Sequence, residues 1–251
     1  MEQGVFLDQP AEKKGTHPMS VAGNVAVIDA SSNDVIGAGV DIAILQAPVV
    51  SYSLPSLQFQ ISKTQEFSIR FLDIVGSVIL LVLSLPAMLF IAVLIKIFSP
   101  GHIFFKQERV GKNGKLFTLH KFRTMINNAE QHTGPVLAAK DDSRVTPIGK
   151  FLRATRLDEL PQLFDVLKGD MSLVGPRPER PFFIRRHRVL QGVRLSVKPG
   201  LTGLAQVRGY YDLKPEHKIR YDYLYIQNRS LLLNIYILLQ TIPVIFLKRG
   251  W

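Results

Sequence analysis

The chain has 251 residues, which gives room for one sizeable domain with an appendage. It contains no cysteine, so disulfides, thiolate metal sites and a cysteine nucleophile are excluded. The formal net charge of +11 is uneven, with 4 Lys/Arg and 8 Asp/Glu in residues 1–95 (net −4) against 27 and 12 in residues 96–251 (net +15). The basic part suggests an anionic partner such as nucleic acid, an acidic membrane surface or a phosphorylated substrate, although general solubility explains such a charge equally well.

Residues 1–66 contain no motif. A polar start is followed, over residues 21–50, by a stretch rich in Val, Ala, Ile and Gly that could form short strands. We interpret residues 1–66 as a poorly ordered or accessory extension.

Residues 74–95 form an uncharged stretch of 22 residues, and about 20 suffice to cross a bilayer. Ser84-Leu85-Pro86 lies near its middle and predicts a kink or break, because proline removes a helical hydrogen bond. Two topologies follow: a kinked spanning helix, or a re-entrant helix that returns both flanks to one face. Basic residues from Lys96 onward indicate that the following part is cytoplasmic. The re-entrant topology predicts that Ser68 and His102 are both accessible only from the cytoplasm.

The remaining chain mixes hairpin and helical patterns. Alternation on both sides of residues 111–114 predicts a β-hairpin with strands at 103–106 and 116–120. Helical patterns follow at residues 127–133, 151–168, 180–191 and 215–228, and residues 198–203 form a turn with two glycines. Residues 231–247 are apolar but interrupted by polar residues, which favours an amphipathic helix at the membrane interface, with a core helix as an equal alternative.

Adjacent carboxylates occur at Asp158 and Glu159, between Arg156 and the stiff Gly-Pro-Arg-Pro turn that carries Arg177. Neighbouring arginines favour the ionised form of a carboxylate and can hold phosphate oxygens. An ionised carboxylate beside phosphate-binding groups could act as a nucleophile on phosphorus. Pro161 suits the first turn of a helix that begins at about residue 157, which would put the pair at its N-terminus. The alternative is an acidic helix N-terminus that contributes a few tenths to about one kcal/mol.

Three further basic residues are candidates for phosphate binding. Lys121 and Arg123 are two apart on a predicted strand and therefore share a face, which suits a clamp. Arg177 sits between two prolines, so its guanidinium is pre-organised for phosphate, with a surface salt bridge as the alternative.

The remaining candidates carry weaker signals. Arg109 and Arg156 could bind phosphate but could also pair with nearby acids. Asp222 could complete a metal or sugar site, or be a buried structural acid. Gly200 and Gly203 could let the backbone approach a nucleotide, although the turn alone would explain them.

Several long motifs, in the right order over residues 67–251, resemble the bacterial sugar transferases. These are the monotopic phosphoglycosyl transferases, also described as polyprenyl-phosphate sugar-1-phosphate transferases. The motifs are the hydrophobic segment with Pro86, the stretches FKQERVG (105–111) and HKFRTM (120–125), the run 156–178, and the stretches KPGLTGLAQ (198–206) and RYDY (220–223).

The resemblance implies a reaction in which a sugar-1-phosphate moves from a UDP-sugar to a polyprenyl phosphate, undecaprenyl phosphate above all, releasing UMP. Such a step begins exopolysaccharide, capsule, O-antigen or glycoconjugate synthesis. It implies that Asp158 is the nucleophile of a covalent phosphosugar intermediate, that Glu159 is a metal ligand or orienting group, and that Mg²⁺ is required, with the pair as its site. The family's re-entrant helix breaks at a Ser-Pro pair. Here Ser84 and Pro86 are separated by Leu85, which leaves the position of the break open.

We therefore predict a mostly helical α+β protein of the small form of the family, because residues 1–66 are too short and too polar for the extra domains of larger members. Its expected parts are the extension (1–66), a re-entrant membrane helix broken near Ser84 and Pro86 (67–98), and a cytoplasmic catalytic domain with a β-hairpin and interfacial helices (99–251). The expected location is the bacterial inner membrane.

The expected partners are a UDP-sugar, polyprenyl phosphate and inner-membrane lipid, with a homo-oligomer left open. Nucleic acid is not expected, because no recognised module or aromatic stacking platform accompanies the basic residues. The alternative from another class is a non-catalytic membrane-bound scaffold or anion-binding protein.

Overall fold

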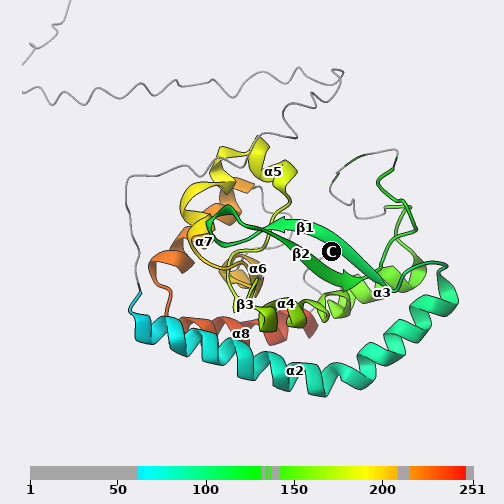
Figure 1. Ribbon diagram of the computed structural model, residues 1–251, viewed down its shortest axis with the longest axis horizontal. Helices are drawn as coiled ribbons and strands as arrows, with labels where there is room; N and C mark the ends of the chain where they lie inside the picture. Colours follow the sequence, from blue (N-terminus) through cyan, green and yellow to red (C-terminus); the bar gives the residue numbers. More distant parts are fainter. Residues whose placement is uncertain (1–60, 132–133, 135, 137–141, 209–214, 247–251) are drawn as a thin grey trace, which may run out of the picture. The chain divides into compact units, whose positions relative to one another are not determined.

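The computed structural model describes residues 61–131, 134, 136, 142–208 and 215–246, so nearly all of the predicted extension (1–66) lies outside the described residues. The described part is mostly helical, as predicted, and contains two small sheets (Figure 1). In chain order its elements are α2 (Lys63–Phe98), β1 (Phe104–Val110), η1 (Lys112–Gly114), β2 (Leu116–Phe122), α3 (Pro147–Thr155), η2 (Leu157–Glu159), α4 (Gln162–Lys168), β3 (Ser172–Val174), α5 (Pro181–Arg186), η3 (Arg188–Leu190), η4 (Gly192–Ser196), β4 (Gly200–Thr202), α6 (Leu204–Arg208), α7 (Pro215–Gln227) and α8 (Leu231–Phe246).

The long helix α2 contains 36 residues and begins at Lys63, slightly before the predicted start at residue 67. Ser62 caps it, because the Ser62 Oγ accepts a hydrogen bond from the Gln65 amide at 3.2 Å. Pro86 lies inside the helix, and Figure 1 shows α2 bent with its concave side toward the other elements. Among the described residues, α2 is the one helix long and apolar enough to cross a membrane.

Both halves of α2 pack against the same globular part. In the first half, the Arg70 guanidinium donates to the Val166 and Leu167 carbonyls at 2.7 and 2.8 Å. One Asp73 carboxylate oxygen accepts from the Ser172 hydroxyl and the Leu173 amide, both at 2.8 Å. The second half contributes to a cluster that comprises Met88, Ile91, Ile95, Phe122 and Leu152. The helix is therefore built into the fold along its whole length.

The predicted β-hairpin is confirmed. β1 and β2 pair antiparallel from Phe104 opposite Phe122 to Val110 opposite Leu116, so both strands are longer than predicted. The turn between them contains Asn113 with φ of 57°, a left-handed conformation that asparagine tolerates.

A second sheet joins β3 and β4 in parallel, where the sequence predicted only a turn over residues 198–203. Its two strands lie very close together. A Cβ on Gly200 would come within 2.0 Å of the Gly175 nitrogen, and one on Gly203 within 2.2 Å of the Gly175 oxygen. These two glycines therefore allow backbone to lie against backbone.

The other predicted helices differ in extent. Residues 127–131 form turns rather than a helix, and the predicted helix over 180–191 is divided into α5 and η3. The predicted helix over 151–168 is interrupted between α3 and α4, whereas α7 and α8 form as predicted.

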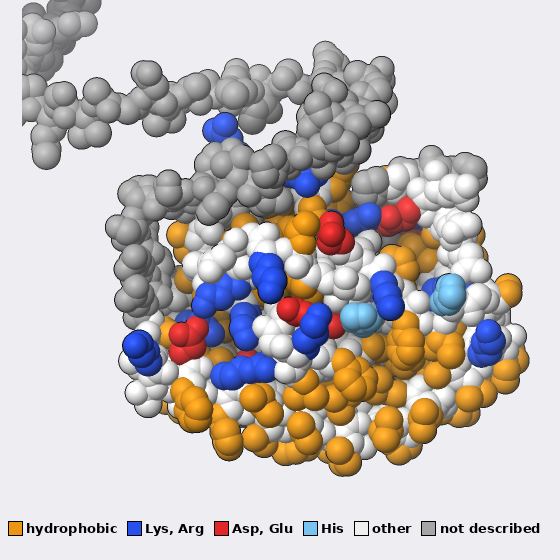
Figure 2. Space-filling view, viewed as in Figure 1, with side chains coloured by type: hydrophobic (Ala, Val, Ile, Leu, Met, Phe, Trp, Pro, Cys, Tyr) orange, Lys and Arg blue, Asp and Glu red, His pale blue; other side chains and the backbone are white. Residues whose placement is uncertain are grey.

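The main core lies between β2, α4, β3, η4, α7 and α8. Its buried side chains are Phe117, Leu119, Leu163, Val166, Met171, Leu173, Val174, Val193, Val197, Tyr225, Ile226 and Ile237. On α8, Asn234 and Ile237 are fully buried while Leu232, Leu239 and Ile242 are exposed, so this helix has one inward and one outward face. Apolar side chains of α2 are likewise exposed, and Figure 2 shows hydrophobic side chains filling the edge of the molecule where α2 runs. An apolar surface of this kind associates with a membrane.

Candidate active site

The acidic pair lies in a short 3₁₀ turn, η2, between α3 and α4. Thr146 caps α3 through a hydrogen bond from the Gly149 amide to the Thr146 Oγ1 at 3.0 Å. The helix ends at Thr155, because Arg156 adopts a left-handed conformation with φ of 61°. A non-glycine residue in this region is uncommon and redirects the chain sharply. The pair was predicted in the first turn of an α-helix, but α4 starts only at Gln162.

Glu159 and Arg177 form the central ion pair of the site. The Arg177 guanidinium donates to a Glu159 carboxylate oxygen at 2.8 Å. Burial raises the pKa of Glu159, but the positive charge and hydrogen bond of Arg177 outweigh it and hold the pKa below its ordinary value. Glu159 therefore stays ionised at neutral pH. Its negative charge raises the pKa of Arg177 in return.

Asp158 is 6% exposed and has a different electrostatic environment. Burial, followed by the negative charge of Glu159, raises the pKa of Asp158 to about 6, while Lys121, Arg153 and Arg177 act to lower it. This carboxylate is thus ionised at neutral pH, yet incompletely stabilised by its surroundings. Such a group is a better nucleophile than a fully paired one.

Lys121 is the cation with the largest electrostatic effect on Asp158. Burial lowers the pKa of Lys121 to about 8, and the negative charge of Asp158 opposes this change. The Lys121 ammonium also lies 5.3 Å from the centre of the Phe105 ring. The structure thus brings this predicted residue to the acidic pair.

Arg109 and Arg156 also lie near the pair. Burial lowers the pKa of each to about 10, and the charges of Arg177 and Glu159 act on both. The Arg109 guanidinium donates to the Pro178 carbonyl at 2.9 Å and to Gln107 at 2.5 Å. Arg109 therefore contacts the backbone next to Arg177.

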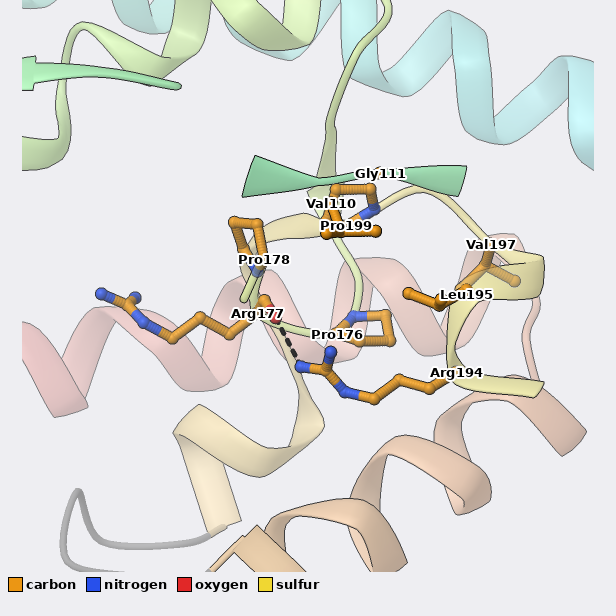
Figure 3. A pocket seen from close by; sticks show the side chains of 9 residues that line it. All are labelled: Val110, Gly111, Pro176, Arg177, Pro178, Arg194, Leu195, Val197 and Pro199. Carbon is orange, nitrogen blue, oxygen red and sulfur yellow. Dashed lines mark hydrogen bonds between the residues drawn. The ribbon is translucent and has the colours of Figure 1, made fainter. Parts of the chain in front are cut away.

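A shallow hollow adjoins Arg177. Figure 3 shows the Arg177 side chain pointing away from this hollow and the Arg194 guanidinium facing the Arg177 carbonyl. The hollow is lined by Val110, Gly111, Pro176, Arg177, Pro178, Arg194, Leu195, Val197 and Pro199.

Arg123 is not brought to the acidic pair. Its guanidinium donates to the Ser99 carbonyl at 2.6 Å, the Pro100 carbonyl at 2.8 Å and the Asn127 side chain at 2.6 Å. These contacts place it at the C-terminal end of α2. The shared face with Lys121 required a strand through residue 123, but β2 ends at Phe122, so the alternation of side chains stops there.

Asp222, Gly200 and Gly203 occupy structural positions in the described part. The Asp222 carboxylate accepts from the Arg194 Nε at 2.8 Å, and both side chains are 4% exposed. This arrangement corresponds to the buried structural acid weighed from the sequence. The two glycines allow close backbone contact with Gly175, which corresponds to the alternative of turn geometry.

Two functional candidates were missed from the sequence. Arg153 is the second cation that lowers the pKa of Asp158, and its Nε donates to the Thr124 hydroxyl at 2.8 Å. It precedes Asp158 by five residues, a spacing that an unbroken helix would place on different faces. Arg194 belongs to a 3₁₀ segment without a motif. Neither had a local signal.

A metal ion at this site would have few protein ligands. Among the described residues, no group of three or more His, Asp or Glu side chains could hold a metal. Asp158 and Glu159 supply two carboxylates, and a diphosphate substrate would add oxygens. This set fits Mg²⁺, which is usually held by one or two carboxylates, phosphate oxygens and water.

Comparison with known proteins identifies relatives. A family model described as "Bacterial sugar transferase" matches residues 64–248. The chain is 45% identical over 195 residues to the UDP-N-acetylgalactosamine-undecaprenyl-phosphate N-acetylgalactosaminephosphotransferase of Aeromonas hydrophila, covering 72% of this chain and 44% of that protein. It is 44% identical over 189 residues to the UDP-glucose:undecaprenyl-phosphate glucose-1-phosphate transferase of Klebsiella pneumoniae, covering 72% and 40%. It is 35% identical over 195 residues to the exopolysaccharide production protein ExoY of Sinorhizobium fredii, covering 72% and 86%. The chain thus spans less than half the length of the first two relatives.

Proposed function

The chain belongs to the bacterial sugar transferase family, and from this premise we propose that it transfers a sugar-1-phosphate from a UDP-sugar to undecaprenyl phosphate. The printed names of two relatives specify undecaprenyl phosphate and a UDP-sugar, and a third is named for exopolysaccharide production. The observation that carries the proposal is the buried Asp158, whose pKa is raised to about 6 although three cations surround it.

The first step is an attack of the Asp158 carboxylate on the β-phosphorus of the UDP-sugar. A bond forms between a carboxylate oxygen and this phosphorus, and the bond to the bridging oxygen breaks. UMP leaves with that electron pair, and the sugar-1-phosphate remains on Asp158. Lys121, Arg153 and Arg177 offset the negative charge that accumulates around the phosphorus.

In the second step, a phosphate oxygen of undecaprenyl phosphate attacks the same phosphorus. The bond to Asp158 breaks, and the carboxylate is regenerated as the polyprenyl-diphosphate sugar forms. Splitting the transfer in this way means that two anionic substrates never have to occupy the site together. The exposed apolar side chains of α2 and α8 would keep the protein at the membrane that holds the second substrate.

Asp158 and Glu159 are the residues that would hold Mg²⁺, which supplies charge neutralisation of the diphosphate when bound. Glu159 already uses one carboxylate oxygen for Arg177. Its own contribution is to orient Arg177 and to raise the pKa of Asp158.

For the membrane topology, the re-entrant arrangement fits the packing of α2. Its 36 residues would extend about 54 Å if straight, well beyond a hydrocarbon core of about 30 Å. Asp73 in the first half and Ile95 in the second half both contact the same globular part. A helix with its ends on opposite membrane faces could not make both contacts. This supports a catalytic part on the cytoplasmic face of the inner membrane, where a nucleotide sugar is available.

Intact-protein mass spectrometry after incubation with a UDP-sugar and Mg²⁺ tests the reaction. The wild type should gain the mass of a phosphosugar, and undecaprenyl phosphate should remove it. Asp158→Asn should gain none, whereas Asp170→Asn, which removes a carboxylate paired with Lys168, should behave as the wild type. An adduct retained in Asp158→Asn together with full turnover would show that another residue is the nucleophile. A wild type that forms no adduct with any UDP-sugar would favour the scaffold alternative.

Cysteine labelling tests the topology, and the absence of native cysteine removes background. Thr64→Cys and His102→Cys change exposed positions on either side of the apolar stretch. Both should react with a membrane-impermeant thiol reagent only when the cytoplasmic face is open to it. Leu85→Cys, near the bend, should react from neither side. Reaction of Thr64→Cys and His102→Cys from opposite faces would rule out the re-entrant arrangement.

A further inference from the structure

In the segment from Pro176 to Glu179, which contains Arg177, each of the four successive carbonyls accepts a hydrogen bond. None of the four donors belongs to the turn that contains the acidic pair. The Gly200 amide donates to Pro176 at 2.9 Å, the Arg194 guanidinium to Arg177 at 2.5 Å, the Arg109 guanidinium to Pro178 at 2.9 Å and the Val110 amide to Glu179 at 3.0 Å. Two prolines restrict the same backbone. The position of Arg177 is thus fixed through the backbone, and these contacts do not use its guanidinium.

Of the two donors that are side chains, Arg194 is the more buried. It is buried, and its guanidinium joins two partners at once: the Nε donates to Asp222 on α7, and the Nη2 donates to the Arg177 carbonyl. The Glu179 carboxylate lies 3.9 Å away. A buried ion pair loses the hydration of both charges, so it contributes little net stability compared with apolar packing. A positional role accounts better for such a pair when one partner also holds a functional segment.

We propose that Asp222 and Arg194 are positioning residues that set the place of Arg177 beside Glu159 and Asp158. Asp222 fixes the orientation of the Arg194 fork, and the fork holds the Arg177 carbonyl. The Arg177 guanidinium, at the other end of the same residue, then meets the Glu159 carboxylate at 2.8 Å. The effect on catalysis rests on the function proposed above, whereas the effect on the backbone does not.

This chain of contacts assigns Asp222 a role different from metal or sugar binding. Its carboxylate is 4% exposed and directed to Arg194, so it does not face the acidic pair. Removing its charge should leave the substrate contacts in place but loosen the segment that presents Arg177. A displacement of a substrate-orienting group by about 1 Å can lower a rate about a hundredfold.

Two readouts test the proposal: hydrogen exchange of the amides of Val110, Gly175 and Gly200, and the rate of adduct formation from a UDP-sugar. In Asp222→Asn, the three amides should exchange faster and the adduct rate should fall about ten- to a hundredfold. Asp222→Glu, which keeps the charge, should recover most of both. Arg194→Lys keeps its charge but loses the two-armed fork, and it should resemble Asp222→Asn. If Asp222→Asn does not fold, Arg194→Lys takes its place in both measurements.

A double-mutant cycle separates positioning from general destabilisation. On the background of Arg177→Gln, the Asp222→Asn change should lower the adduct rate no further, because its effect passes through Arg177. The matched control is Asp165→Asn, which removes another buried carboxylate, bound to His120. It should lower thermal stability while leaving the three amides and the adduct rate unchanged.

Unchanged exchange in both Asp222→Asn and Arg194→Lys would overturn the proposal, as would multiplicative effects in the double mutant. If the wild type forms no adduct with any UDP-sugar, the proposed function fails. The exchange experiment then still decides whether Asp222 and Arg194 hold the segment.

Discussion

Two groups of polar side chains lie near the end of β2, and they differ in the groups that they contact. The site group comprises Lys121, Arg153 and Arg177, which surround the carboxylates of Asp158 and Glu159. The anchor group comprises Arg123 and Asn127, which bind the carbonyls that follow α2. Lys121 and Arg123 are only two residues apart in the sequence, yet they belong to different groups.

The difference shows how a basic residue acquires a structural or a functional role. Arg123 donates to neutral carbonyls at the C-terminal end of a long helix, where a positive charge is favourable. Its contacts join the end of α2 to the end of β2. The site group instead meets carboxylates, one of which has a raised pKa. Under the proposed function, its cations balance charge that changes during the reaction. We therefore expect substitutions in the anchor group to alter stability, and those in the site group to alter chemistry.

The largest expected effect is that of Asp158→Asn. Loss of the proposed nucleophile should lower adduct formation and turnover at least about a thousandfold. The same change should raise the free energy of unfolding at pH 7 by about 2 kcal/mol, because a buried carboxyl with a raised pKa destabilises the folded state once it ionises. Adduct kinetics and thermal melts in detergent measure the two effects. A variant that loses activity and also stability would contradict the separation of the two groups.

Arg177→Gln should have the next largest effect. Removal of this cation should lower the rate of adduct formation about a hundredfold, as for the loss of one group that stabilises a transition state. Arg177→Lys should recover only part of the rate, since an ammonium lacks the fork. Equal rates for Arg177→Gln and wild type would remove Arg177 from the site group.

Arg123→Gln should have the opposite profile. The shorter side chain cannot reach all of the partners of Arg123. Carbonyls left without a hydrogen-bond donor should lower the free energy of unfolding by about 2–3 kcal/mol. The adduct rate per folded molecule should stay within about threefold of wild type. Denaturation in detergent and adduct kinetics on the same preparation give both values. A large rate loss at unchanged stability would move Arg123 back to the phosphate clamp predicted from the sequence.

The pH dependence gives the smallest but most specific effect. In the proposed mechanism, adduct formation requires ionised Asp158, so the rate should fall as the pH drops below about 6, by about tenfold at pH 5. In Arg177→Gln, the lost cation should move this acidic limb of the pH–rate profile to higher pH, because Arg177 lowers the pKa of Asp158. In Arg123→Gln, the limb should not move. Single-turnover rates between pH 5 and 8 test all three proteins.

Elements with a strong local signal were predicted correctly. The hairpin was specified by Gly111, Gly114 and the alternation on either side, and α8 by its apolar run. The strands β3 and β4 were missed because each has three residues, which is too short for a period to be recognised. Their parallel pairing also joins segments far apart in the chain, so no turn marks it.

The site was predictable in part. The acidic pair, Arg177 and Lys121 were identified from the sequence, and the structure places them together. Arg153 and Arg194 could not be found, because their positions depend on the left-handed Arg156 and on a 3₁₀ segment. Arg123 was assigned by extending strand alternation one residue too far. In each case, side-chain direction depended on a break in regular structure, and such breaks are set by long-range packing.

The sequence by itself determined the apolar α2, the hairpin, the acidic pair and the resemblance to the sugar transferases, because these rest on local patterns and ordered motifs. Only the tertiary structure decided which cations meet Asp158 and which close the end of α2. It also decided that both halves of α2 pack on one globular part and that Asp222 pairs with Arg194. The physical reason is that the charge environment of a buried carboxylate depends on distances across the fold, which side-chain periodicity does not encode.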